Sequence, residues 1–127
     1  MQKRIKKRFD IEIPNAQEVY SKTFDLDKNI TALHGILFTS DRDDLLYYRG
    51  AAKVELNRQE IFPDGYESKL LMSGLNVSPN NRYYNLNGMP VGNGKLKIDY
   101  KDTPDVRLEF NAYRVSVYLE CEIIEEA

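Results

Sequence analysis

The sequence predicts an antiparallel β-sandwich or jelly roll of about eight to ten strands, with at most one or two short helices. Several segments alternate apolar and polar residues, which is typical of strands with one buried face. Turn residues recur about every ten positions, as in sandwiches and barrels. The 127 residues, 42% hydrophobic and 30% charged, indicate one globular domain over residues 1–127.

The clearest strand covers residues 113–123, where one face carries Tyr113, Val115, Val117, Leu119, Cys121 and Ile123. The same alternation predicts strands at 8–13, 53–57, 95–101 and 106–110. Residues 30–40 are apolar on both faces, which favours a central strand. Two short segments fit a helix as well as a strand, namely 40–48, which begins with Ser40 and three acids, and 67–73.

Glycine, proline and asparagine predict the turns. Residues 91–95 place Asn-Gly directly before a strand, which predicts a tight hairpin. Pro63-Asp64-Gly65 predicts a second turn, because proline presets φ and glycine accepts a positive φ. Residues 102–105 are expected to join two strands, and residues 78–81 to form a loop.

Composition excludes several function classes. The net charge of −2 argues against a protein whose whole surface binds polyanions. Because Cys121 and His34 are single, they exclude an internal disulfide, a cysteine-built zinc site and any mechanism that needs two histidines. Both fall on predicted apolar rows, which favours structural roles.

The densest acidic group, Asp41, Asp43 and Asp44, lacks the calcium-loop pattern. A turn or a helix N-terminus explains these acids as well, and whether they bind an ion stays open. We therefore predict no catalytic residue, no metal site and no cofactor, and a protein that is not an enzyme.

Charge is unevenly distributed along the chain. The first eight residues form a predicted basic arm (1–8) that leads into the first strand and contains Lys3, Arg4, Lys6, Lys7 and Arg8. The other 119 residues contain 13 basic and 20 acidic groups, a net charge of −7. The basic arm and the acidic C-terminus are expected to attract each other within a monomer or between copies, and salt would weaken that attraction. Contact of the arm with a polyanion is a further option.

Tyrosine is unusually frequent, with nine residues and no tryptophan. Tyrosine is enriched at protein interfaces because it offers contact area at a small entropy cost. The predicted interface therefore combines the five basic residues of the arm with Tyr47, Tyr48, Tyr83, Tyr84 and Tyr118. Ordinary packing of tyrosine on a β-sheet is the alternative for these rings.

The order of these features resembles that of small all-β, jelly-roll structural proteins of bacteriophage virions, of the capsid, penton, capsid-auxiliary or head-fibre type. The resemblance rests on the basic start KRIKKRFDIEI, the loop-rich stretch NVSPNNRYYNLNGMPVGNG and the final strand YRVSVYLECEII. It implies a non-enzymatic subunit that associates repeatedly with itself or decorates a capsid. It transfers no functional residue to this chain.

The predicted function is therefore structural, as a homo-oligomeric virion component that contacts other virion proteins. The N-terminus lacks the apolar core of a secretion signal, and no apolar run is long enough for a membrane helix. The expected location is thus the virion, after synthesis in the host cytoplasm. Two alternatives stay open: a carbohydrate-binding β-sandwich module and a carboxylate-dependent hydrolase.

Overall fold

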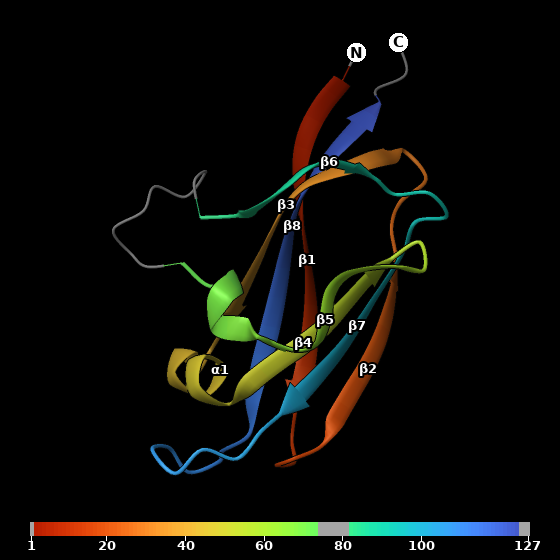
Figure 1. Cartoon of the computed structure of the whole chain (residues 1–127). Helices are drawn as coiled ribbons and strands as arrows, with labels where there is room; N and C mark the ends of the chain where they lie inside the picture. The colour runs from red at the N-terminus through yellow and green to blue at the C-terminus, as the bar shows by residue number, and fades with distance from the viewer. Residues whose placement is uncertain (1, 74–81, 125–127) are drawn as a thin grey trace.

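The computed structural model describes residues 2–73 and 82–124, which form two layers of antiparallel strands (Figure 1). The chain ends lie together at one end of the sandwich, and α1 lies at the other. In these residues the elements are, in order, β1 (Gln2–Ile13), β2 (Val19–Asp25), β3 (Ile30–Ser40), α1 (Asp43–Arg49), β4 (Gly50–Leu56), β5 (Gln59–Glu67), the 3₁₀ helix η1 (Ser68–Leu71), β6 (Tyr84–Pro90), β7 (Lys95–Asp102) and β8 (Tyr113–Ile124).

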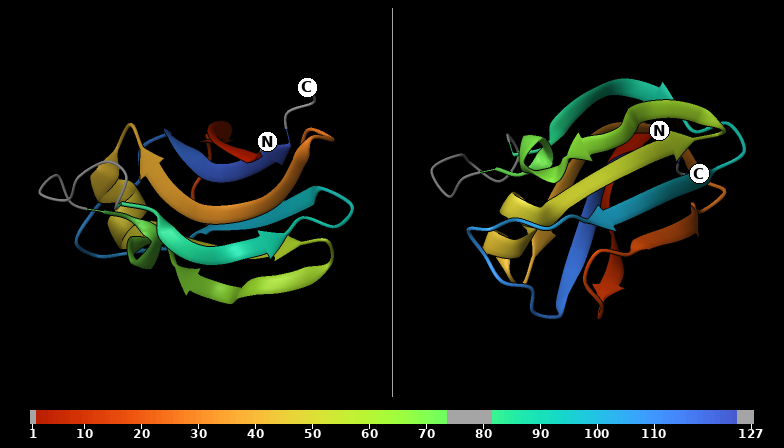
Figure 2. Two further views of the ribbon diagram at one scale, coloured as in Figure 1. Left: turned by 90° about the horizontal axis from the view of Figure 1, so that it is seen from above. Right: turned by 60° about the horizontal axis from the view of Figure 1, so that its bottom comes forward.

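The strand order is that of a jelly roll. One four-stranded layer, sheet A, has the order β1-β8-β3-β6, and the other, sheet B, has the order β2-β7-β4-β5. Strand β1 pairs with β8, β2 with β7, β3 with β6 and β4 with β5. The chain is therefore one long hairpin wound into two stacked sheets, as Figure 2 shows from two further sides. The predicted all-β sandwich is confirmed.

The core lies between the two sheets and follows the alternation of the sequence. Val115, Val117 and Leu119 of β8 are completely buried, as are Leu96 and Ile98 of β7. Strand β3 lies inside sheet A and is buried along most of its length, as expected for a central strand. Burial of these faces is the main stabilising contribution to the fold.

The two predicted helical segments form, whereas the predicted turns form only in part. The segment 40–48 overlaps α1, which continues to Arg49, and 67–73 contains η1. The turn at 91–94 forms, with the Gly94 N–H donating to Val91 O at 2.9 Å. It is not a hairpin, however, because it connects β6 of sheet A to β7 of sheet B. The predicted loop at 78–81 lies outside the described residues.

Two predictions were wrong in this part of the chain. Residues 63–65 lie inside β5 rather than in a turn, and the hairpin between β4 and β5 turns at Asn57 and Arg58, which have φ values of 54° and 63°. No strand forms at 106–110, which belongs to the connection between β7 and β8. The side chain and backbone of Arg107 bond to Asp105 there, and this local turn replaces strand pairing.

The predicted basic arm is also wrong as a separate segment. Strand β1 begins at Gln2 and pairs with β8 residue by residue, from Gln2 opposite Ile124 to Ile13 opposite Tyr113. Strand β8 is long enough to pair with the basic residues as well, so these cations belong to strand β1. Strands β2, β5 and β6 were not predicted, because polar residues, Pro63 and Gly88 interrupt the alternation of apolar and polar positions in these segments.

Candidate assembly surface

The cations of β1 are divided between its two faces. Arg4, Lys6 and Arg8 are exposed on the outer face of sheet A. Lys3 and Lys7 alternate with them and follow the parity of the buried residues of β8. Lys7 forms an ion pair with Asp27 at the margin of the sandwich. The structure therefore places three of the five predicted basic residues in a row on one surface.

Two of the predicted tyrosines join this row. The Lys6 ammonium lies 5.6 Å from the centre of the Tyr83 ring, and the Arg8 guanidinium lies 5.8 Å from that of Tyr118. Both distances fit cation–π contacts. An open hollow of about 380 Å³ lies between them, and its lining residues are Lys6, Leu37, Thr39, Arg82, Tyr83 and Tyr118.

Gly35 of β3 allows Tyr83 to approach the sheet closely. A Cβ atom at Gly35 would come within 2.7 Å of the Tyr83 Cβ, so a larger residue would displace the ring. Burial raises the pKa of the Tyr83 hydroxyl above its ordinary value. We call the outer face of sheet A around Lys6, Arg8, Tyr83 and Tyr118 the tyrosine–cation face.

The other predicted tyrosines lie elsewhere. Tyr47 and Tyr48 are exposed on α1, and the Arg107 guanidinium lies 4.4 Å from the centre of the Tyr48 ring. Tyr84 contacts Phe62 of β5 edge to face, with the ring centres 5.2 Å apart. The structure therefore does not gather the five tyrosines on one surface. Tyr47 and Tyr48 lie on α1, whereas Tyr83 and Tyr118 contact the cations of β1.

The outer face of sheet B has a different chemistry. Its central strand β7 presents Lys95, Lys97, Asp99 and Lys101. Lys95 binds Asp25 at 2.9 Å, and Lys53 binds Glu55 at 3.1 Å. Alternating charges of this kind are typical of a solvated face, so the two sheets offer unlike surfaces.

The thiol and the imidazole do not form a pair. Cys121 is fully buried, and burial raises the pKa of its thiol to about 11, which makes it a poor nucleophile. His34 was expected in the buried row of β3, but the register of β3 with β8 shifts between Leu33 and Gly35. This bulge turns His34 to the other face, where Nε2 lies 3.1 Å from a carboxylate oxygen of Glu122.

The three acids near α1 have structural contacts. Asp41 accepts a hydrogen bond from the Arg114 N–H at 2.8 Å, and Asp44 accepts from the Leu45 N–H and pairs with Arg42. Asp43 lies in the first turn of α1, where acids are favoured. Within residues 2–73 and 82–124, no three His, Cys, Asp or Glu side chains gather closely enough to hold a metal ion.

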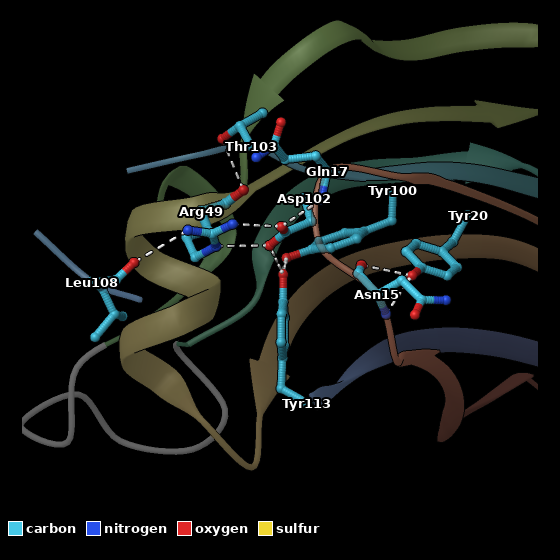
Figure 3. A network of polar contacts seen from close by, with 9 residues as sticks. All are labelled: Asn15, Gln17, Tyr20, Arg49, Tyr100, Asp102, Thr103, Leu108 and Tyr113. Atoms are coloured by element: carbon cyan, nitrogen blue, oxygen red, sulfur yellow. Dashed lines mark hydrogen bonds and ion pairs between the residues drawn. The ribbon is translucent and has the colours of Figure 1, made fainter. Parts of the chain in front are cut away.

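A buried ion pair lies at the α1 end of the sandwich (Figure 3). The Asp102 carboxylate accepts four hydrogen bonds: from Arg49 Nε and Nη2 at 3.1 and 2.8 Å, from the Tyr113 hydroxyl at 2.9 Å and from the Gln17 N–H at 3.0 Å. The Tyr100 hydroxyl lies 2.8 Å from that of Tyr113. Because each carboxylate oxygen has two donors, the pair is held without solvent.

Arg49 connects further segments to this pair. Its Nη1 donates to Leu108 O at 3.1 Å, and its own carbonyl accepts from the N–H and the hydroxyl of Thr103. The guanidinium also lies 5.5 Å from the centre of the Phe110 ring. The pair therefore joins α1, the 103–112 connection and both adjoining strands, which makes it a structural clamp.

Sequence reasoning missed this clamp, although one signal was present. Asp102 continues the buried row of Leu96, Ile98 and Tyr100, so a carboxylate stands where the pattern requires an apolar residue. A buried carboxylate needs a cationic partner. The partner could not be found by spacing, because Arg49 is 53 residues away and the sequence contains 18 basic residues.

The two tyrosines of the clamp lead to a prediction for alkaline pH. Burial raises the pKa of Tyr100 and Tyr113 above their ordinary value of 10.0. Their contribution to stability is complete below pH 10, and we expect the free energy of unfolding to fall above it, since only the unfolded chain ionises them. Tyrosinate absorbance and urea denaturation test this. Two tyrosines should ionise only with unfolding, and ionisation of all nine in the folded protein would contradict it.

No known protein family, curated protein or solved structure significantly matches this chain. In the described residues, neither helix is long and apolar enough to cross a membrane.

Proposed function

We propose that this chain is a non-enzymatic structural subunit that assembles with copies of itself into a larger particle, of the kind that builds or decorates a virion. The observation that carries the proposal is the contrast between the two sheet faces. Sheet A presents aromatic rings beside cations around an open hollow, whereas the outer face of sheet B is lined by charged side chains. The jelly-roll strand order, which capsid and lectin domains share, supports it at the level of the fold.

The chemistry of the tyrosine–cation face suits another copy of this chain. Tyr83 and Tyr118 are half-buried, so a partner would cover large rings that already lack much of their freedom. The cations of β1 face outward from a molecule whose other 119 residues carry a net charge of −7. A second copy therefore offers acidic surface to a basic strand, and such complementarity sets orientation and the rate of association.

Sedimentation velocity over a concentration series tests the proposal. We expect species heavier than the 14.8 kDa monomer. Replacing Tyr118 by serine should weaken association by about tenfold or more, as for a central aromatic contact. Val19→Ser is the matched control, because Val19 is 58% exposed on the outer face of sheet B. A chain that stays monomeric at millimolar concentration overturns the proposal.

Carbohydrate binding is a second candidate, favoured by the hollow itself. Tyr83 and Tyr118 offer rings and Thr39 offers a hydroxyl, which are the groups that contact a sugar. A glycan array followed by titration of any hit distinguishes the two functions. Binding by a monomeric chain that Tyr118→Ser abolishes would support the lectin function, and an array without hits would remove it.

A further inference from the structure

The edge strands of the sandwich are not equally protected. Strand β5 contains Pro63 and a Gly65 with φ of 80°, and its pairing with β4 shifts register twice. Strand β6 has positive φ at Asn87 and Gly88, and it ends at Pro90. Prolines and bulges prevent further strands from adding to an edge. One side of the sandwich is therefore closed to strand addition.

The opposite side has continuous edges. Strand β1 pairs with β8 over twelve consecutive residues without a register shift, and it contains neither proline nor glycine. Strand β2 below it is also regular but has only seven residues. In the described part of the chain, β1 is an outermost strand of sheet A. It thus offers the longest uninterrupted edge for a further strand.

The backbone direction at this edge follows from β8. In an antiparallel strand, the N–H and C=O of one residue point to the same side, and successive residues alternate. The Ile124 N–H donates toward Asn29, Glu122 O accepts from Thr31, and the Arg114 N–H donates to Asp41. All three contacts lie on the β3 side, so the even-numbered residues of β8 bond toward β3 and the odd-numbered ones toward β1.

The register transfers this parity to β1. Because Ile5 lies opposite Cys121, the odd-numbered residues of β1 bond to β8. The even-numbered residues direct their N–H and C=O groups to the free edge. Their side chains are exposed on the outer face of sheet A, and in chain order they are Arg4, Lys6, Arg8, Asp10 and Glu12.

This row has a polarity that an antiparallel copy would complement. The cations come first and the acids follow, so reversing the strand brings cations opposite acids. With a two-fold axis at Phe9, Arg8 lies opposite Asp10 and Lys6 lies opposite Glu12, and the symmetry repeats both pairs. Moving the axis to residue 8 keeps opposite charges together, with Lys6 facing Asp10, but it adds a contact of Arg8 with itself at the axis. Moving the axis to residue 7 sets Lys6 against Arg8. Opposite charges across strands stabilise pairing and like charges oppose it.

The other face of the same pairing is apolar except for Lys7, which lies opposite Ile11. Phe9 meets its own copy at the axis, and Ile5 lies opposite Ile13. Phe9 is half-buried and stacks on Phe24 with ring centres 4.5 Å apart, so it is already held in place. Within one molecule, Arg8 bonds to Asp10 at 2.9 Å. Pairing would extend this contact into a group of four alternating charges.

We infer that two copies of this chain join through antiparallel pairing of their β1 strands about a two-fold axis at Phe9, forming one continuous eight-stranded sheet. The inference rests on the proposed function to the extent that both require self-association, and it adds a contact at the β1 edge to that of the tyrosine–cation face. The same patch serves both copies, so the arrangement closes as a dimer. The tyrosine–cation faces of the two copies then lie side by side on one extended sheet.

Charge exchange tests the contact. The acidic variant carries Lys6→Glu and Arg8→Glu, and the basic variant carries Asp10→Lys and Glu12→Lys. In a dimer of either variant with itself, four pairs of like charges lie opposite each other across the β1 strands. We expect such a dimer to be at least about tenfold weaker than that of the native chain. An equimolar mixture restores four opposite pairs and should dimerise about as tightly as the native chain. Lys97→Glu with Lys101→Glu on sheet B is the control, because it changes the net charge as the acidic variant does.

A disulfide tests the register. In a background with Cys121→Ala, Phe9→Cys should form an intermolecular disulfide, because the two Phe9 positions meet in a close, non-hydrogen-bonded pair. Lys7→Cys should not, since residue 7 lies opposite Ile11. Circular dichroism confirms that each variant is folded.

The outcomes separate this inference from the proposed function. Native chains that associate while both charge variants associate equally well would overturn the β1 contact and leave the structural function standing. A mixture that fails to restore association also overturns it. A native chain that is monomeric at millimolar concentration overturns the proposed function, and the β1 contact with it. Association restored only in the mixture supports the inference.

Discussion

Replacing Asp102 by alanine is expected to lower the free energy of unfolding by about 3–5 kcal/mol, the usual cost of removing one partner of a buried ion pair. The side chain of Arg49 is 5% exposed and would keep its charge without a carboxylate. The Tyr113 hydroxyl and the Gln17 N–H would each lose an acceptor as well. Urea denaturation followed by circular dichroism measures the loss.

A second variant separates the buried charge from general damage. Arg49→Met combined with Asp102→Leu removes both charges and should cost less than Asp102→Ala alone, because no unpaired charge is left. Asp105→Ala removes the carboxylate that pairs with the exposed Arg107 and should change stability far less. A loss below about 1 kcal/mol for Asp102→Ala would show that the clamp does not stabilise the fold.

Gly50→Ala is expected to destabilise the protein by about 1–3 kcal/mol or more through overpacking. Gly50 has an ordinary φ of −88°, so backbone strain is not the reason. A Cβ atom there would overlap the Tyr100 hydroxyl oxygen and lie 2.7 Å from Leu46 O. The methyl group would displace Tyr100, and with it the hydroxyl that contacts Tyr113.

Gly65→Ala is the matched control for this prediction. Gly65 has a positive φ of 80°, but no atom lies within 4 Å of an added Cβ. Its expected cost is about 1 kcal/mol from the left-handed backbone alone. Thermal denaturation should show a larger loss of stability for Gly50→Ala than for Gly65→Ala. In an alkaline titration, Gly50→Ala should also ionise one more tyrosine than the native chain before it unfolds. Equal losses would mean that the close contact at Gly50 relaxes freely.

Local pattern was sufficient for much of the fold. The alternation along residues 113–123 and 95–101 identified β8 and β7, and the doubly apolar segment 30–40 identified the central strand β3. It failed at 106–110, where three apolar residues alternate without a partner strand. Alternation records which side chains share a face, but a strand also needs a neighbour to satisfy its backbone.

The candidate surface was predictable in composition but not in arrangement. The sequence identified Lys6, Arg8, Tyr83 and Tyr118, yet only the pairing of β1 with β8 and the close approach at Gly35 bring them together. The spacing of residues along the chain cannot predict such contacts, because they join positions as far apart as 48 residues for Gly35 and Tyr83 and 100 or more for β1 and β8.

By itself, the sequence determined an all-β chain with a basic N-terminal segment, one buried thiol and abundant tyrosine. Tertiary structure alone decided the jelly-roll order, the bulge that turns His34 outward, the Arg49–Asp102 clamp and the free edge of β1. The physical reason is that side-chain periodicity acts over neighbouring residues. Strand order and buried pairing instead depend on which distant segments together cover the most apolar surface and satisfy the most polar groups.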